Sequence, residues 1–529
     1  MTEPIPSRRR GAAAASIAML LLAGCAGLAP PSSTAPGAGA PATPAQWQAP
    51  LPHGGQLGDL QRWWRQFNDP LLVQLIEAGQ QASPTVAAAR ARIEQSRAAR
   101  VASSAALLPS LDAAAALSRA RTDFVTPVGT LASASLQAAW ELDVYGANRA
   151  GADAAQARLE GSVASWHDAR VSVAAEVAST YLSLRACEAQ LAQTQFDATS
   201  RTETARLTEL AAKAGFQPPA NADLARASAA QGSATVTQQR ASCDLAVKAL
   251  VALTAQPEPA LREQLAAGSA RLPQPAQIAV AAVPAQALAQ RPDLLAAARD
   301  VTAASADTSQ AQAQRYPRIG LSGSIGPARF ETGGGSTSGT LWSFGPVTVS
   351  LPLFDGGARR ANAEAARARY DAATIIYAAS LRTAVREVET ALVALQSTAA
   401  RNDDARIAAE GFERSYRAAD SRFRGGLASL FELEDARRTA VAAQSALIDL
   451  QRERVAAWIS LYRALGGGWS ADDSQARGGS PADDSQARDG WPADGSQARG
   501  GWSADGSQAP SGWTPQDPTA GRPALASRN

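Results

Sequence analysis

A strand that runs directly into a helix occurs twice in this chain. In residues 347–357, apolar side chains stand at alternate positions until Gly356 and Gly357, and a pattern rich in alanine, arginine and glutamate follows at once. Residues 136–146 repeat the alternation, end at Gly146 and lead into the same kind of pattern. Alternation indicates a strand, and spacings of three and four indicate a helix, so these glycines are predicted strand-to-helix turns.

These turns belong to an internal duplication. Pro84 and Pro109 are 25 residues apart (109 − 84), as are Pro292 and Pro317 (317 − 292), and the offset between the copies is 208 there (292 − 84). After the turns the offset is 211 (357 − 146). The second strand hairpin therefore carries three extra residues, which we expect in a glycine-rich loop within residues 331–339.

A long helix pattern follows each turn. Residues 148–213 and 359–424 contain no proline and few glycines, and their apolar positions recur every three or four residues. Each run predicts a helix of about 65 residues, or roughly 100 Å, with coiled-coil spacing. Both runs end near a glycine, Gly215 or Gly426, and a second apolar pattern then returns. The sequence predicts two long antiparallel helical hairpins.

The strand patterns predict a membrane pore. There are four of them, at residues 108–117, 131–145, 316–325 and 341–354. Their lengths suit tilted membrane strands, for which about 9 to 11 residues suffice. Four strands cannot close a barrel, and an open edge is not tolerated in lipid. Two chains would give eight strands and a filled barrel, whereas three give twelve and a lumen. A trimeric pore is the favoured hypothesis; small soluble sheets are the alternative, because Asp112 lies among alanines.

The second strand indicates which face would meet lipid. One side carries Leu136, Ala138, Trp140 and Leu142, and the other carries Gln137, Glu141 and Asp143. We expect the polar side to line the lumen. A slip of one residue would turn the acids toward lipid, so the register is expected to be strict.

The N-terminus carries a bacterial export signal. Three arginines precede the apolar run 12–23, which is too short to span a bilayer and has the size of a signal-peptide core. The run ends in Leu-Ala-Gly-Cys, a lipobox, so residues 1–24 are predicted to be removed and Cys25 to carry a covalent lipid. An ordinary signal peptide with an incidental cysteine is the alternative. Ala26 is not an acidic retention signal, which favours the outer membrane. Residues 25–56 are predicted to be a linker.

The duplication sets the remaining boundaries. The first structural repeat is expected at residues 57–254 and the second at 285–469. The Pro/Ala/Gln-rich segment 255–284 is expected to connect them around the middle of the molecule. Residues 470–529 contain an eleven-residue repeat of Gly, Pro, Ser and Asp, which predicts a disordered tail with no assigned function.

The composition argues against several classes of function. The formal net charge is only +2, so no basic field indicates nucleic acid. The sequence has only two histidines, His53 and His167, and it has no paired-cysteine motif and no cluster with metal-ligand spacing. It therefore lacks the residues that metal-dependent or histidine-based catalysis would need. We therefore predict no enzyme, no metal and no cofactor beyond the lipid on Cys25. Glu387 and Glu389 are expected on a solvated or lumen-facing helix surface.

Several motifs in order resemble the outer-membrane efflux lipoproteins of the TolC-like, OprM/NodT type. Beside the lipobox they are WRQFNDP at 64–70, RPDL at 291–294, PLFDGG at 352–357, VETAL at 388–392 and LYRALGGGW at 461–469. The resemblance covers about residues 25–469. It implies a mixed, mainly α fold of duplicated strand and helical hairpins, which by trimerisation forms a twelve-stranded β-barrel on a twelve-helix α-barrel. It also implies a location in the outer membrane, with extension into the periplasm.

The same resemblance implies partners and a docking site. The homotrimer would be coupled through a periplasmic adaptor to an inner-membrane transporter of the resistance-nodulation-division type. The helical tips would dock the adaptor and gate the tunnel. The tip residues are Gly215, Phe216 and Gln217 in the first hairpin and Gly426, Leu427, Ala428 and Ser429 in the second. The alternative is a pair of helix turns with no partner.

Two cysteines of the mature chain are placed symmetrically about the first tip. The mean of 187 and 243 is 215, so Cys187 and Cys243 should lie level on facing helices. The periplasm permits a disulfide, although helix axes about 8 to 10 Å apart must come closer than usual to form one. We predict the bond; two small buried apolar side chains are the alternative.

The leading functional hypothesis is a passive exit channel for drugs or other small molecules. A second is the exit channel of a type I protein secretion system, against which the lipobox and the LGGGW ending argue. A third, of a different class, is a periplasmic coiled-coil scaffold lipoprotein without a pore.

Overall fold

The computed structural model describes residues 47–49, 60–121, 128–275, 288–289 and 291–468. The chain divides into a unit at residues 1–473 and a second at 474–529, and every described residue belongs to the first. The predicted signal peptide, Cys25 and nearly all of the 25–56 linker lie outside the described residues, as does the predicted tail at 470–529.

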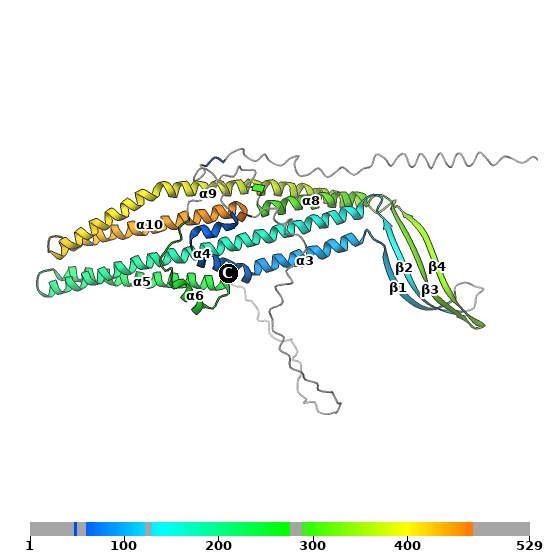
Figure 1. The fold of residues 1–529 in the computed structure, drawn as a ribbon, viewed down its shortest axis with the longest axis horizontal. Helices are drawn as coiled ribbons and strands as arrows, with labels where there is room; N and C mark the ends of the chain where they lie inside the picture. Colours follow the sequence, from blue (N-terminus) through cyan, green and yellow to red (C-terminus); the bar gives the residue numbers. More distant parts are fainter. Residues whose placement is uncertain (1–46, 50–59, 122–127, 276–287, 290, 469–529) are drawn as a thin grey trace, which may run out of the picture. The chain divides into compact units, whose positions relative to one another are not determined.

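Helices dominate the described chain, with four strands between them (Figure 1). In chain order the elements are η3 (Leu60–Phe67), α2 (Pro70–Ala82), α3 (Pro84–Ala105), β1 (Ser110–Ala120), β2 (Gly129–Leu142), α4 (Ala147–Lys213), α5 (Pro219–Thr254), α6 (Glu258–Ala266), α8 (Pro292–Ala313), β3 (Arg318–Thr332), β4 (Gly335–Ser350), α9 (Ala358–Arg424), α10 (Leu430–Ala464) and η4 (Gly466–Gly468). α6 lies within the predicted linker at 255–284.

The two helical hairpins are present as predicted. α4 and α9 are 67 residues each; α4 packs along α5 and α9 along α10. The turns use glycine in the left-handed region, Gly215 at φ +79° and Gly426 at φ +72°, where other residues are strained. In the first turn, Phe216 N donates to Ala211 O at 2.9 Å; in the second, Leu427 N donates to Arg422 O at 2.8 Å. These bonds close both helix ends in the same way.

The two copies meet where α4 of the first packs against α8 and α10 of the second. Within the copies, α3 packs against α4 and α8 against α9. Residues from many elements share one large apolar core, which includes Trp63, Leu75, Tyr181, Leu392 and Trp458. In the described part of the chain, no helix has the length and apolar character needed to cross a membrane.

The four strands form one antiparallel sheet in the order β1-β2-β3-β4. β2 of the first copy pairs with β3 of the second, from Gly129 opposite Thr332 to Leu142 opposite Ile319. β1 and β4 are therefore the edges. In β4, Gly345 and Pro346 together stand opposite Ser322 because the register shifts there, which is the two-against-one arrangement of a β-bulge.

The glycine-rich tip predicted within 331–339 is present, but it is a turn of only two residues. β3 continues to Thr332 and β4 starts at Gly335, so only Gly333 and Gly334 separate the strands. The pairing Glu331 opposite Ser336 belongs to the sheet. The extra residues lengthen the second hairpin and supply its bulge. At the other end β2 stops at Leu142, three residues before the predicted end.

Candidate functional site

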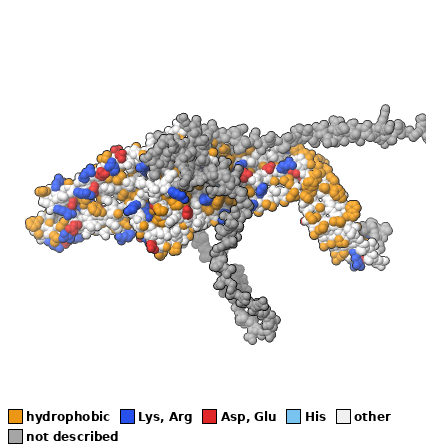
Figure 2. Space-filling model, in the orientation of Figure 1, with side chains coloured by type: hydrophobic (Ala, Val, Ile, Leu, Met, Phe, Trp, Pro, Cys, Tyr) orange, Lys and Arg blue, Asp and Glu red, His pale blue; other side chains and the backbone are white. Residues whose placement is uncertain are grey.

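The sheet has one strongly apolar face. Residues directly opposite each other share a face, and the register places Leu136 opposite Ile325, which itself stands opposite Trp342. These side chains are 48%, 54% and 75% exposed within one chain. Other exposed apolar residues in register on this face are Leu111, Leu117, Trp140, Phe344, Val347 and Val349. Figure 2 shows apolar side chains gathered over the sheet.

The other face is mostly small and polar, and its large apolar side chains are Leu131, Phe330 and Leu341. Asp112 stands opposite Gln137, which stands opposite Ser324 and then Ser343, giving one polar row across all four strands. Ser324 Oγ and Ser343 Oγ are 3.0 Å apart. This separation of faces confirms the alternation expected from the sequence. It is the pattern of a sheet with lipid on one side and water on the other.

Both strand-to-helix turns are built from glycine and a capping aspartate. Gly146 (φ +74°), Gly356 (φ +64°) and Gly357 (φ +89°) are in the left-handed region. Asp143 accepts hydrogen bonds from the backbone N–H groups of residues 148 and 149, at 3.0 and 2.8 Å. Asp355 does the same for residues 357 and 359, at 3.0 and 3.3 Å. A carboxylate at this position satisfies free N–H groups and complements the helix dipole.

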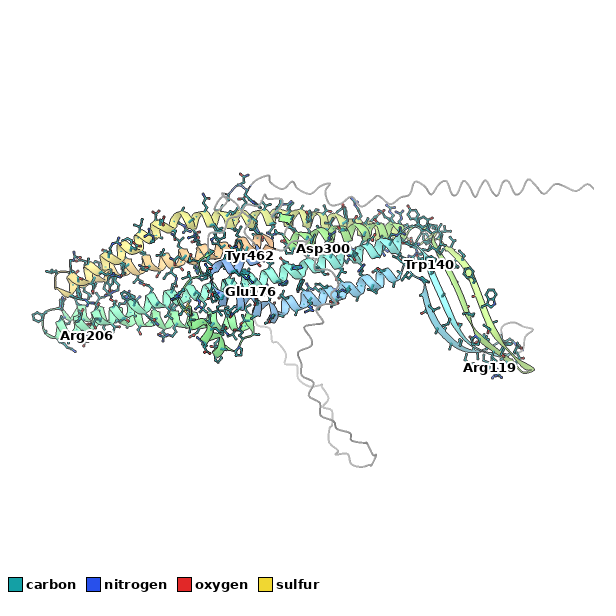
Figure 3. The ribbon with its side chains drawn as sticks, viewed as in Figure 1. Arg119, Trp140, Glu176, Arg206, Asp300 and Tyr462 are labelled. Atoms are coloured by element: carbon teal, nitrogen blue, oxygen red, sulfur yellow. A yellow bond between two sulfur atoms is a disulfide. The ribbon has the colours of Figure 1, made fainter. Side chains whose placement is uncertain are left out.

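The prediction that Asp143 lies in a strand is therefore wrong, and its place on the lumen wall stays a prediction. Asp143 follows the end of β2 and caps α4. At the same junction Trp140 Nε1 donates to Leu107 O at 3.0 Å, and Figure 3 places Trp140 where the sheet meets the helices. Tyr145 and Tyr316 stack with ring centroids 5.0 Å apart. Aromatic residues at this level are typical of a membrane–water interface.

The hairpin tips expose large apolar side chains. Phe216 is 84% exposed, Leu427 80% and Phe431 77%. Gln217 accepts from Asn221 Nδ2 at 2.7 Å. Ser429 is the N-cap of α10 and accepts from Glu432 N at 3.1 Å, so its hydroxyl has a structural partner.

A buried polar network joins the two hairpins above the tips, and sequence reasoning missed it. Arg437, 1% exposed, donates to Glu434 Oε1 at 2.7 Å and to Thr204 Oγ1 at 2.8 Å. Arg201 donates to Ser228 Oγ at 2.9 Å, and that hydroxyl donates to Glu434 Oε2 at 3.2 Å. We call Arg201, Thr204, Ser228, Glu434 and Arg437 the inter-hairpin network. Its signal in the sequence was an arginine in the apolar spacing between Leu433 and Ala440.

A second charged cluster ties the helices together near the middle of the chain. Arg291, 6% exposed, donates to Asp293 Oδ2 at 2.7 Å, to Glu387 Oε2 at 2.8 Å and to Ala464 O at 2.8 Å. It thus links the start of α8 to α9 and α10. Burial raises the pKa of the nearby Asp168 carboxyl, and the negative charge of Asp293 adds to this effect.

Glu389 holds the segment that leads back toward Cys25. Its carboxylate accepts from Gln48 N at 2.5 Å and from Ala49 N at 2.8 Å. Trp47 and Ala49 are buried. The side chain of Glu387 is 42% exposed, in keeping with the predicted solvated helix surface. What the sequence did not predict is that both carboxylates also hold distant parts of the chain.

Two titratable groups of α4 are perturbed by burial. Burial lowers the pKa of His167 to about 4 from its ordinary value of 6.5, and the charge of Arg170 contributes. Burial also raises the pKa of Tyr181, whose hydroxyl donates to Asp69 Oδ2 at 2.6 Å. Among the described residues, no group of three or more His, Cys, Asp or Glu side chains could hold a metal ion.

Cys187 and Cys243 form a disulfide between α4 and α5, with Cα atoms 5.5 Å apart. Gln239 Nε2 donates across the same two helices to Cys187 O at 3.2 Å. The symmetric placement of the cysteines about Gly215 was thus the sequence signal for this bond.

The fold, the two-faced sheet and the paired hairpins agree with what is known of one family. Residues 75–256 and 283–467 match the family model described as outer membrane efflux protein. The chain belongs to this family.

Relatives of this efflux protein cover most of the chain. The toluene efflux pump outer membrane protein TtgI of Pseudomonas putida is 29% identical over 475 residues, which cover 86% of this chain and 98% of that protein. The pyoverdine export outer membrane protein OpmQ, also of Pseudomonas putida, is 30% identical over 455 residues, with 82% and 93% covered. The solved outer-membrane channel OprN has a TM-score of 0.71 at 26% identity, with 81% and 98% covered. The resemblance inferred from the motifs is confirmed, and the protein is an outer-membrane efflux channel.

Proposed function

We propose that three copies of this efflux protein form a passive exit channel for small molecules, and that the chain itself carries out no catalysis. The observation that carries the proposal is the four-stranded sheet with two edge strands and one exposed apolar face. An unpaired edge is costly in lipid. Pairing β4 of one chain with β1 of the next removes every edge when the ring closes, and three chains supply twelve strands (3 × 4), enough for a lumen.

The stoichiometry is tested by native mass spectrometry of the protein extracted from outer membranes in mild detergent. The expected species contains three chains. A monomer that remains folded and active in transport, or a dimer, would contradict the proposal, since eight strands leave an interior filled by side chains.

A lipid on Cys25 is also part of the proposal, and the chain length supports it. From Cys25 to Trp47 there are 22 residues (47 − 25), which extend to at most about 73–79 Å. From the start of α9 at Ala358 to Glu389 there are 31 residues (389 − 358), or roughly 47 Å of helix. The linker can therefore reach from the Glu389 site to the end of α9 that adjoins the sheet. Metabolic labelling with an alkynyl fatty acid should mark the wild type and not Cys25→Ser; equal labelling of both would refute it.

The tips are proposed to dock a periplasmic adaptor that couples the channel to an inner-membrane transporter of the resistance-nodulation-division type. Phe216 and Leu427 present apolar surface at both turns, as docking residues do. A photoreactive phenylalanine analogue at Phe216 should crosslink to the adaptor in cells. The same analogue at Phe196, which is also exposed but lies on the helix shaft, is the matched control. Crosslinking at Phe196 alone would place the docking surface elsewhere.

A further inference from the structure

We propose that the Cys187–Cys243 disulfide is a covalent register lock for the first helical hairpin, formed because the tip half of that hairpin has almost no apolar core of its own. The bond lies 28 residues before and 28 residues after Gly215 (215 − 187; 243 − 215). This lock is a property of the hairpin, whatever the channel transports.

The tip half of the first hairpin, residues 188–242, buries no large apolar side chain within one chain. Its buried positions are Asp197, Thr204, Thr208, Ala222, Ala225 and Gly232. Two of its large apolar side chains, Phe196 and Leu210, are more than half exposed. Burial of large apolar side chains is what normally holds two helices in register, so little apolar burial fixes α4 against α5 here.

The second hairpin is constructed differently over the equivalent length. Tyr416, Leu433 and Ala440 form a separate apolar cluster, with Phe423 packed against it. Leu430 and Leu450 are also buried. At the offset of 211, the positions that match the two cysteines are residues 398 and 454, a threonine and an arginine. The cross-link therefore occurs in the copy that lacks the apolar core and not in the copy that has one.

The bond also marks the place where packing against the middle of the molecule ends. Arg185 and Glu188, close to Cys187, hold the end of α6 and the segment after it: Arg185 Nη1 donates to Leu265 O at 2.9 Å and Ala270 N donates to Glu188 Oε2 at 3.0 Å. On α5, Val247 and Leu250 lie in the large core, whereas residues 233–242 contribute no buried side chain. The disulfide fixes the two helices at the point where apolar support stops.

Forming the lock is a two-electron oxidation. The two thiols lose two protons and two electrons as the sulfur–sulfur bond forms, and the disulfide of a periplasmic thiol oxidoreductase accepts them and becomes a dithiol. The two cysteines are the only ones that remain besides the predicted lipid-bearing Cys25. Maturation of this chain after export therefore needs an oxidant that converts its two thiols into the disulfide.

Hydrogen exchange on the full-length protein in detergent tests the lock, with the second hairpin as an internal control. Mild reduction followed by thiol alkylation should raise amide exchange in residues 190–240 at least tenfold and leave residues 402–452 unchanged. The Cys187→Ala/Cys243→Ala double variant should reproduce this result, and the reduced wild type keeps the test valid if the variant does not fold. Equal exchange before and after reduction, or two free thiols in the protein isolated from cells without reductant, would overturn the proposal.

Discussion

An arginine placed on the apolar face of the sheet should block outer-membrane assembly, whereas an arginine one residue further along should not. Leu136 is near the centre of β2 and stands opposite Ala113 and Ile325. Its neighbour Gln137 points to the other face and stands opposite Asp112 and Ser324. Leu136→Arg and Gln137→Arg are therefore matched in strand, depth and new residue, and differ only in the face that receives the charge.

The expected difference follows from the cost of a charge in lipid. An arginine on the lipid face costs about 2–4 kcal/mol at the bilayer midplane, which lowers the folded-to-unfolded ratio by a factor of about 30 to 700, since about 1.4 kcal/mol corresponds to tenfold. Gln137→Arg meets the carboxylate of Asp112 on a watery face, where the effect of a charge pair is within about 1 kcal/mol.

The assay is the amount of heat-modifiable trimer in outer-membrane fractions separated on a density gradient. Leu136→Arg should be largely absent from these fractions, and Gln137→Arg should match the wild type. If Leu136→Arg assembles normally while Gln137→Arg fails, the faces have been assigned the wrong way round; if both assemble normally, the sheet does not lie in lipid.

Three further predictions concern pH, sheet packing and the N-terminal segment. The pKa of His167 is about 4 in the folded chain, against an ordinary value of 6.5, so the unfolded chain binds the proton more tightly. The contribution of neutral His167 to stability is therefore complete above pH 6.5 and is lost as pH falls toward 4. In His167→Gln the midpoint of thermal unfolding should depend less on pH across that range than in the wild type, and the same pH dependence in both proteins would refute this. A Cβ at Gly326 would clash with a backbone carbonyl oxygen of β2, whereas one at Gly339 would meet nothing within 4 Å. Gly326→Ala should therefore reduce the yield of trimer severalfold, and Gly339→Ala should not. Equal trimer yields for the two variants would argue against this packing of the strands. Glu389→Ala removes the acceptor for two N–H groups, so proteolysis before residue 57 should be several times faster than in the wild type. The control is Glu364→Ala, which breaks only an exposed ion pair on the same helix. Equal rates of proteolysis in both variants would contradict the anchoring role of Glu389.

Much of the architecture could be predicted because the sequence contains two copies of the same structural pattern. The equal separation of the prolines and the constant offset between equivalent residues aligned the two copies. The prediction of a helix end at Gly215 therefore supported the prediction of one at Gly426. The disulfide could be predicted because a hairpin places residues equidistant from its turn at the same level. The faces of the sheet followed from alternation, since opposite residues in register share a side.

The errors came where one residue type serves two purposes. Asp143 fits both a polar strand position and a helix cap, and only the end of pairing at Leu142 distinguishes them. Residues 335–340 have no apolar alternation because they are all Gly, Ser or Thr, yet they pair with β3 as the first part of β4.

The apolar spacing around Arg437 indicates burial, but the helix against which this charged group is buried could not be predicted from the sequence. Arg226 and Arg437 occupy equivalent positions in the two copies, but Arg226 is 65% exposed in its side chain and Arg437 only 1%. The difference arises because α10 packs against α4 of the other copy. The packing of one hairpin on the other decides which helix a residue contacts. The spacing of apolar residues along a single helix does not identify that partner helix.

Single-channel recording in planar bilayers tests the central claim, that this chain makes a conduit through the outer membrane. Both the wild-type trimer and Glu434→Ala/Arg437→Ala are recorded. The double change removes the Glu434–Arg437 ion pair of the inter-hairpin network, and Arg201 keeps its ion pair with Asp197, so no charge is left buried alone. The change frees the tips to separate. The expected result is uniform conductance steps, larger or longer-lived in the variant. A correctly assembled trimer that gives no steps in either form would contradict the claim and leave a scaffold without a pore.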